Sequence, residues 1–271
     1  MTMPAARDFG GSIPEYYDRY MGPAQFEAFG ADLVRRLPAK PRGDVLEIAC
    51  GTGIVTRRLR EHLDPAVRLV ATDLSRAMLD YARAKLAKSP GIEWQEADGA
   101  ALPFADSAFG AVVCAFGIAF VSDRPSAFRQ MRRVLRKGGV LLFNVWDSID
   151  ENAHARASDE LVSSLFPGDP ELQLATLPYG FHDQRQIRAL LAEADFRELR
   201  IEKARIEIQS PSVRAYATGL IKGTPRSTLL RQRGASLDEV INKLAVALTR
   251  VGGDEPFRCP AQALVVEAQA I

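Results

Sequence analysis

Histidine and cysteine are scarce in this sequence, with three residues of each among 271. Cys50, Cys114 and Cys259 are far apart, form no C-x-x-C pair and have no histidine at zinc-ligand spacing. We therefore expect reduced structural thiols and no metal site. An excess of either charge is also missing, because 35 lysines and arginines against 34 acids leave a formal charge of +1. This argues against a nucleic-acid partner, since no overall field favours one.

Long apolar runs are lacking as well. No run approaches the roughly 18 residues that a membrane-spanning helix needs. The start, MTMPAARDFGGSIPEYYDRY, lacks the basic-then-apolar order of a signal peptide. We expect a cytoplasmic protein without a membrane span. With 47% hydrophobic and 25% charged residues, the chain has an ordinary globular composition and enough length for one large core.

Strand-like and helix-like patterns alternate along the first 146 residues. Apolar segments read as strands at DVLEIA (44–49), RLVATD (68–73), IEWQEA (92–97), GAVVCAF (110–116) and VLLFNVW (140–146). Between them, apolar residues repeat with helical spacing. Ser75 is placed to cap one helix, while Asp123 with Pro125 opens another that carries Leu135 and stops at Gly138. Apolar strands separated by amphipathic helices predict a parallel sheet covered on both faces.

The remaining sequence continues this rhythm less regularly. LRIEKARIEI (199–208) and AQALVVEAQ (261–269) read as two further strands, and residues 211–252 as helices, with Ser236 and Glu239 forming a capping box. We predict a single domain over residues 1–271. It has a core of about 25–148, an insertion at 149–182 and an acceptor cap at about 211–252.

A glycine turn follows the first strand in VLEIACGTG. In an open parallel sheet, ligands bind at the carboxyl ends of the strands, where such a turn lies. Any tight strand-to-helix turn also uses glycine. A dinucleotide site would require G-x-G-x-x-G, but Thr56 occupies the third glycine position and Glu47 would repel a pyrophosphate.

The run EIACGTG resembles the first motif of the class I S-adenosylmethionine-dependent methyltransferases. The resemblance is to small-molecule members, of the ubiquinone/menaquinone-methyltransferase-like type with a type 11 methyltransferase domain. Glu47 matches the motif's acid, while Ala49 stands where its first glycine usually lies. Further segments match in order as far as MRRVLRKGGVLLF, so the resemblance covers about residues 15–146.

This resemblance implies an α/β fold. It is a Rossmann-like, seven-stranded, mostly parallel sheet flanked by helices, with an N-terminal helical lid. Helical insertions follow the fifth strand and separate the last two strands. The implied cofactor is S-adenosyl-L-methionine, which leaves as S-adenosyl-L-homocysteine. Its sulfonium and ammonium charges suit an acid beside the loop.

The resemblance also implies cofactor contacts at the ends of four strands and in the lid. Asp73 would accept hydrogen bonds from the ribose hydroxyls and Asp98 one from the adenine amine, while Leu74 and Met78 would flank adenine. Ala115 and Phe116 would run beside the methionine part, under Tyr20 of the lid. The full predicted set is Tyr20, Glu47, Ala49, Cys50, Gly51, Gly53, Asp73, Leu74, Met78, Ala97, Asp98, Gly99, Ala115 and Phe116.

Methyl transfer from a sulfonium is an in-line displacement, so a dedicated base is optional. Of the histidines, His62 is expected in solvent, and His182 is the candidate base, although a place at a helix start with Asp183 also explains it. No N/D-P-P-[YF] motif follows the fourth strand. We therefore expect a small, partly apolar acceptor, methylated on oxygen, nitrogen or carbon.

Two other functions are compatible with these patterns. One is a domain that binds the cofactor without turning it over, as a sensor or as the partner of another chain. The other is a nicotinamide-dependent oxidoreductase, which Thr56 and Glu47 disfavour. Either a monomer or a homodimer is compatible with the sequence.

Overall fold

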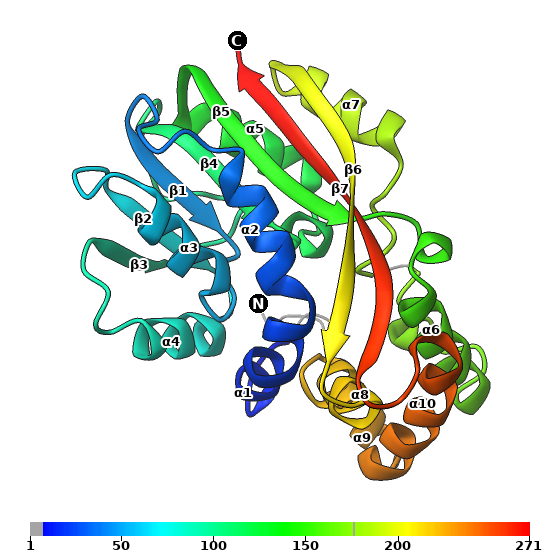
Figure 1. The fold of residues 1–271 in the computed structure, drawn as a ribbon. Helices are drawn as coiled ribbons and strands as arrows, with labels where there is room; N and C mark the ends of the chain where they lie inside the picture. Colours follow the sequence, from blue (N-terminus) through cyan, green and yellow to red (C-terminus); the bar gives the residue numbers. More distant parts are fainter. Residues whose placement is uncertain (1–7, 176) are drawn as a thin grey trace. The chain divides into compact units, whose positions relative to one another are not determined.

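The computed structural model describes residues 8–175 and 177–271. The prediction that no signal peptide is present rests partly on residues 1–7, which lie outside the described residues. Seven strands form one sheet in the order β3-β2-β1-β4-β5-β7-β6 (Figure 1). They are β1 (Asp44–Ile48), β2 (Leu69–Asp73), β3 (Ile92–Glu96), β4 (Phe109–Ala115), β5 (Leu135–Trp146), β6 (Phe196–Ser210) and β7 (Phe257–Ala270). The first five are parallel to one another and β7 is antiparallel to β5, which confirms the predicted fold class.

Helices connect these strands, and side-chain caps begin several of them. The helices are α1 (Ile13–Tyr16), the π-helix η2 (Tyr17–Phe26), α2 (Glu27–Arg35), α3 (Ile54–His62), α4 (Arg76–Lys85), η3 (Gly117–Phe120), α5 (Arg124–Val134), η4 (Ile149–Glu151), α6 (Ala153–Leu165), η5 (Pro170–Leu172), α7 (Gln184–Glu193), α8 (Val213–Lys222), α9 (Arg226–Gln232) and α10 (Leu237–Gly252). Ser75 caps α4, Asp123 caps α5 and Ser236 caps α10 through their side chains, as the sequence predicts.

The predicted end of α5 is wrong. The helix ends at Val134, and Leu135, which pairs with Phe109, already belongs to β5. Gly138 lies inside this strand with φ +78°. The β4–β5 register shifts between Phe109 and Ala111. Gly138 therefore accommodates an irregularity in a strand and does not terminate a helix.

The chain divides into two compact units. Unit 1 comprises residues 1–29, 147–180 and 205–262, and unit 2 comprises residues 30–146, 181–204 and 263–271. The predicted cap lies in unit 1, as does the predicted insertion as far as residue 180. The single-domain organisation stays a prediction.

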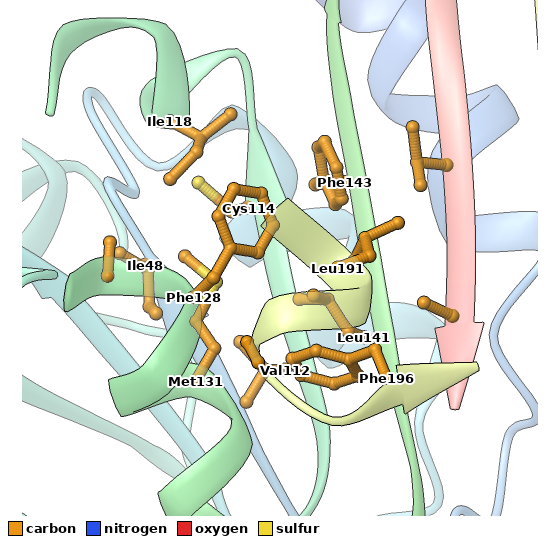
Figure 2. Close-up of a cluster of buried hydrophobic side chains, with 14 of the residues drawn as sticks. Ile48, Val112, Cys114, Ile118, Phe128, Met131, Leu141, Phe143, Leu191 and Phe196 are labelled. Atoms are coloured by element: carbon orange, nitrogen blue, oxygen red, sulfur yellow. The ribbon is translucent and has the colours of Figure 1, made fainter. Parts of the chain in front are cut away.

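Unit 2 buries apolar side chains on both faces of its sheet. Successive residues of each strand point to opposite faces, so Ile48 and Val112 join the cluster that α5 and α7 cover, shown in Figure 2. Val45 and Val113 join the other cluster, which α2 and α3 cover. The alternation places Glu47 on the α3 face.

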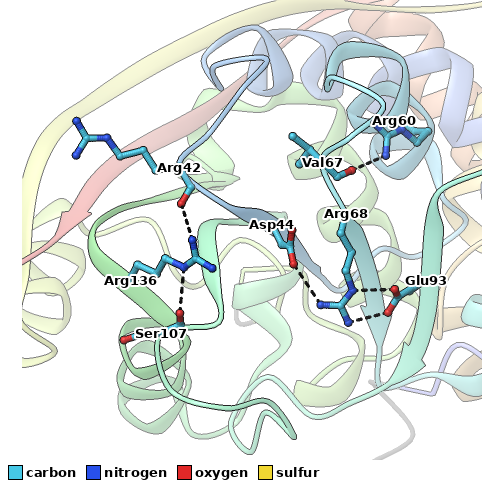
Figure 3. A network of polar contacts seen from close by, with 8 residues as sticks. All are labelled: Arg42, Asp44, Arg60, Val67, Arg68, Glu93, Ser107 and Arg136. Carbon is cyan, nitrogen blue, oxygen red and sulfur yellow. Dashed lines mark hydrogen bonds and ion pairs between the residues drawn. The ribbon is translucent and has the colours of Figure 1, made fainter.

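Hydrogen bonds tie the amino ends of the strands in unit 2 (Figure 3). The Arg68 guanidinium donates two hydrogen bonds of 2.7 Å to the carboxylate of Glu93 and one of 3.4 Å to Asp44. Arg136 donates to the carbonyl oxygens of Ser107 and Arg42 at 3.2 and 3.3 Å. Arg68 and Arg136 thus pair with polar groups of neighbouring segments at this edge of the sheet.

Unit 1 is built from helices that pack on one another. α8 contacts α10 and the π-helix η2, and α10 also contacts α6. Gly219 on α8 allows the close approach of η2, because a Cβ there would lie 2.8 Å from that of Tyr20. Inside the unit, the buried Arg226 guanidinium donates hydrogen bonds of 2.9 Å to Ser158 and Asp159. Within residues 8–175 and 177–271, none of the helices has the length and apolar character that crossing a membrane requires.

Candidate functional site

The turn between β1 and α3 uses left-handed backbone repeatedly. Gly51 has φ +54° and Gly53 has φ +79°. A Cβ on Gly51 would meet nothing within 4 Å, so conformation alone explains this glycine. A Cβ on Gly53 would lie 3.1 Å from Ala82 of α4 and from Leu86, the C-cap of that helix, so its small size also serves helix packing. The neighbouring Cys50 is buried.

Ala49 is a left-handed residue that is not glycine. Its φ is +57°, a conformation that glycine adopts more readily than other residues. This agrees with the glycine that usually stands here in the motif that the turn resembles. A Cβ on Gly117, at the start of η3, would lie only 2.2 Å from the Ala49 methyl carbon. Ala49 therefore fits only because its neighbour across the turn is glycine.

Glu47 is a buried carboxyl group at the end of β1, with 1% of its surface exposed. Its Oε2 atom has no hydrogen-bond partner among the described residues. Burial raises the pKa of Glu47 to about 8, the charge of Asp73 adds to this rise, and the Thr56 hydroxyl opposes it. A ligand cation beside this carboxyl would stabilise its ionised form.

Asp73 connects the end of β2 to the glycine turn. Its Oδ2 accepts a 2.8 Å hydrogen bond from the Gly51 N–H, and its Oδ1 accepts one of 2.8 Å from the Ser75 N–H. Burial raises the pKa of Asp73 to about 6, against the effect of these donors. Beyond it, Leu74 is 45% exposed whereas Met78 is buried.

The end of β3 lies beside the end of β2. The Ala97 N–H donates to the Asp73 carbonyl oxygen at 3.1 Å. Asp98 is exposed, and its Oδ1 accepts a 2.8 Å hydrogen bond from the Ala100 N–H. Gly99 is buried against Ile48, where a Cβ would lie 3.3 Å from a methyl carbon.

The end of β4 turns sharply at Phe116. Ala115 is its last residue, and Phe116 has φ +57°. The Phe116 N–H donates to both the carbonyl oxygen and the Oδ1 of Asn144 on β5, each at 3.0 Å. Its ring lies 4.4 Å from that of Trp146. Asn144 was missed by sequence reasoning, although a polar residue inside the apolar segment VLLFNVW was an available signal.

Except for Met78, which lies in the first turn of α4, the predicted cofactor residues from Glu47 to Phe116 therefore lie at or just after the carboxyl ends of β1 to β4, all within unit 2. Tyr20 belongs to η2 in unit 1, where its ring stacks on Tyr16 at 6.0 Å. The roles of these residues stay predictions, since their positions alone do not identify a ligand.

The three histidines differ in their surroundings. His62, expected in solvent, is partly exposed, and its Nε2 forms a 2.6 Å hydrogen bond with the Leu37 carbonyl oxygen. Burial lowers the pKa of His154 to about 3, so this ring is neutral at pH 7. The candidate base His182 is partly exposed and directly precedes Asp183, the N-cap of α7. In the part of the chain that the structure describes, no group of His, Cys, Asp and Glu side chains is arranged to hold a metal ion.

This region is similar to known proteins. Residues 45–139 match a family described as a methyltransferase domain. The ubiquinone/menaquinone biosynthesis C-methyltransferase UbiE of Pseudomonas aeruginosa is 34% identical over 164 residues, which are 56% of this chain and 64% of that protein. The matched part therefore spans slightly less than two thirds of this relative's length.

Solved structures share the fold at low sequence identity. A Bacillus halodurans protein superposes with a TM-score of 0.60 at 18% identity, covering 90% of this chain and 99% of the other. An S-adenosylmethionine-dependent methyltransferase from Aquifex aeolicus superposes with a TM-score of 0.56 at 13% identity, covering both chains completely. Together with the glycine turn and the acids at the carboxyl ends of β1 and β2, these matches show that residues 45–139 are similar to methyltransferase domains and that the chain shares the fold of solved methyltransferase structures.

Proposed function

We propose that this protein transfers a methyl group from S-adenosyl-L-methionine to a small-molecule acceptor by in-line displacement and releases S-adenosyl-L-homocysteine. The observation that carries the proposal is the pair of carboxyl groups on either side of the glycine turn. Glu47 is buried with an unpartnered oxygen, and Asp73 is held by two backbone N–H groups. A cation would stabilise the ionised form of Glu47, whereas a pyrophosphate would be repelled by the charge of Asp73.

The residues present fit this cofactor. Glu47 would receive its ammonium group, since the unpartnered Oε2 lacks a donor. Asp73 would accept hydrogen bonds from the ribose hydroxyls. The Gly51 and Ser75 N–H groups occupy only some of its lone pairs, so others are available. Leu74 and Met78 would flank the adenine, and Asp98 would accept a hydrogen bond from the adenine amine. When bound, the cofactor supplies an electrophilic methyl group on a sulfonium.

The protein's own contribution to such a reaction is placement. Ala115 and Phe116 would hold the methionine end, so that the acceptor meets the methyl group in line. The role of Tyr20, a residue of η2, stays a prediction. His182 is the side chain we propose as base for an acceptor that must lose a proton. An acceptor nucleophile without such a proton requires no base.

The acceptor is proposed from the relatives. The matched Pseudomonas protein carries the name of a C-methyltransferase of ubiquinone and menaquinone biosynthesis. A quinone-like ring methylated at carbon is therefore the first acceptor to test here. The neutral overall charge agrees with a small molecule in preference to a nucleic acid.

Calorimetric titration with S-adenosylmethionine, S-adenosylhomocysteine and NAD tests cofactor use. We expect binding of the two adenosyl ligands and none of NAD. Asp73→Ala should weaken adenosyl binding by about tenfold or more, because it removes hydrogen bonds made by a charged group. Asp80→Ala is the matched control, since it removes an exposed carboxylate from α4. Binding of NAD alone would contradict the proposal and favour an oxidoreductase.

A binding domain without catalysis is the second candidate function. It shares every cofactor contact with the enzyme, so binding data do not separate the two. The family match favours methyl transfer. Methylated product from a panel of quinols, phenols and amines, detected by mass spectrometry, decides for the enzyme. Cofactor binding without product across the panel favours the binding domain.

A further inference from the structure

Four residues of unit 2 link the end of β5 to the turn after β1. Asn144 on β5 bonds to Phe116, Phe116 is followed by Gly117, and Gly117 faces Ala49. Ala49 and Phe116 have left-handed backbone with φ +57°. Non-glycine residues adopt this conformation at a cost in free energy, and such strain concentrates at functional sites. The strain here therefore suggests a function for this linkage.

Asn144 is a costly choice for its position. It has no exposed surface, and its neighbours along β5 are the buried Phe143 and Val145. Its Nδ2 atom has no hydrogen-bond partner among the described residues, and a buried donor without a partner is unfavourable. An apolar residue would avoid this cost. The advantage of asparagine is therefore its Oδ1, which accepts the Phe116 N–H.

This hydrogen bond acts where β4 ends. The left-handed Phe116 turns the chain out of the strand and into η3. Asn144 holds the Phe116 N–H with its carbonyl oxygen and its side chain together, each at 3.0 Å. Without Oδ1, one of the two acceptors is lost and the strained conformation is less strongly favoured over extended backbone.

The same turn is fixed from its other side by packing. Gly117 leaves room for the Ala49 methyl group, which a Cβ would meet at 2.2 Å. A shift of Phe116 therefore moves Gly117 against Ala49, two residues before Gly51. The end of β4 and the glycine turn consequently move together.

We propose that Asn144 is a positioning residue for the methionine end of the cofactor site. It acts through Phe116 and not by touching the ligand. The inference rests on the proposed function, in which Ala115 and Phe116 run beside the methionine part of the cofactor. Residue 144 thereby affects affinity for that part more than affinity for the adenosine part, whose proposed contacts lie at the ends of β2 and β3.

Two probes that differ in the amino-acid part test this division. S-adenosylhomocysteine carries it, while 5′-methylthioadenosine does not. In calorimetric titrations, Asn144→Ala should weaken S-adenosylhomocysteine binding by about tenfold and change methylthioadenosine binding by less than about threefold. Asn144→Asp keeps an acceptor for the Phe116 N–H, so it should restore S-adenosylhomocysteine binding to within about threefold of wild type.

A second pair of variants covers the case in which changes at Asn144 prevent folding. Gly117→Ala should lower the ratio of S-adenosylhomocysteine affinity to methylthioadenosine affinity, because it disturbs the turn from its other side. Ala49→Gly, added to Gly117→Ala, should restore this ratio by removing the methyl clash. Equal losses for both probes, or an unchanged ratio in both Asn144→Ala and Gly117→Ala, would overturn the inference. A wild-type protein that binds neither probe would overturn the proposed function as well.

Discussion

Replacement of Glu47 by glutamine should stabilise the ligand-free protein increasingly as the pH rises. Burial raises the pKa of this carboxyl from an ordinary value of 4.5 to about 8. The unfolded chain therefore loses its proton near pH 4.5, while the folded chain keeps it up to about pH 8. Between these values the folded state binds more protons, so stability falls with rising pH. The contribution is fully present below pH 4.5 and lost as the pH passes 8.

The size of the effect follows from the shift. The difference between 8 and 4.5 is 3.5 units, and at 1.36 kcal/mol per unit this corresponds to about 5 kcal/mol at high pH and about 3 kcal/mol at pH 7. Glutamine has the shape of the protonated acid and no charge to bury. Glu47→Gln should therefore unfold with a free energy about 3 kcal/mol greater than wild type at pH 7. The two proteins should differ little at pH 4.5.

Urea unfolding at several values between pH 5 and pH 8, without ligand, measures this difference. Glu61→Gln on α3 is the matched control, because its side chain is 60% exposed and its change should stay within about 0.5 kcal/mol. The same Glu47→Gln protein should bind S-adenosylmethionine about 10- to 100-fold more weakly, since a charge-assisted hydrogen bond is lost. A stability difference that does not grow with pH would refute the reasoning. So would a variant less stable than wild type at pH 8.

Three further substitutions test the packing and the buried charge. Gly117→Ala should destabilise the protein by about 1–3 kcal/mol through overpacking. In thermal unfolding, the double variant with Ala49→Gly should recover at least half of this loss. Additive losses would show that the two sites do not touch. Gly219→Ala should cost about 1–3 kcal/mol, because the new Cβ crowds η2, and an unchanged melting temperature would contradict this packing. Asp159→Ala should cost about 3–5 kcal/mol in urea unfolding, because it leaves the buried Arg226 without its carboxylate; a loss under 1 kcal/mol would mean that water reaches the guanidinium.

The sequence predicts the layered part of unit 2 well for a physical reason. Parallel strands are buried on both faces, so they read as continuous apolar runs such as GAVVCAF, and the helices between them carry one apolar stripe. Caps are equally visible, since Ser75 and Asp123 supply side-chain oxygens just before a helical pattern. The error at Gly138 has the same origin. A glycine after a helical stripe looks like a helix end, whereas the β4–β5 pairing decides that the strand has already begun.

Backbone conformation at the site is not visible in the sequence. Ala49 and Phe116 adopt left-handed backbone without being glycine, and only their partners, Gly117 and Asn144, stabilise it. These partners lie far away in the sequence, so no local pattern connects them. The π-helix η2 is hidden in the same way, because the contacts of α8 with it become apparent only when the chain is folded.

The two edges of the sheet in unit 2 differ in how their polar groups are satisfied. At the amino ends of the strands, Arg68 and Arg136 pair with carboxylate and carbonyl oxygens from neighbouring segments (Figure 3). At the carboxyl ends, Glu47 Oε2 and Asn144 Nδ2 have no partners among the described residues, and left-handed backbone recurs. Polar groups that serve only stability are expected to be paired. The unpaired polar atoms Glu47 Oε2 and Asn144 Nδ2, beside the left-handed Ala49 and Phe116, therefore mark the carboxyl ends of these strands as the binding edge, and the unpaired carboxyl accounts for the expected gain in stability when Glu47 loses its charge.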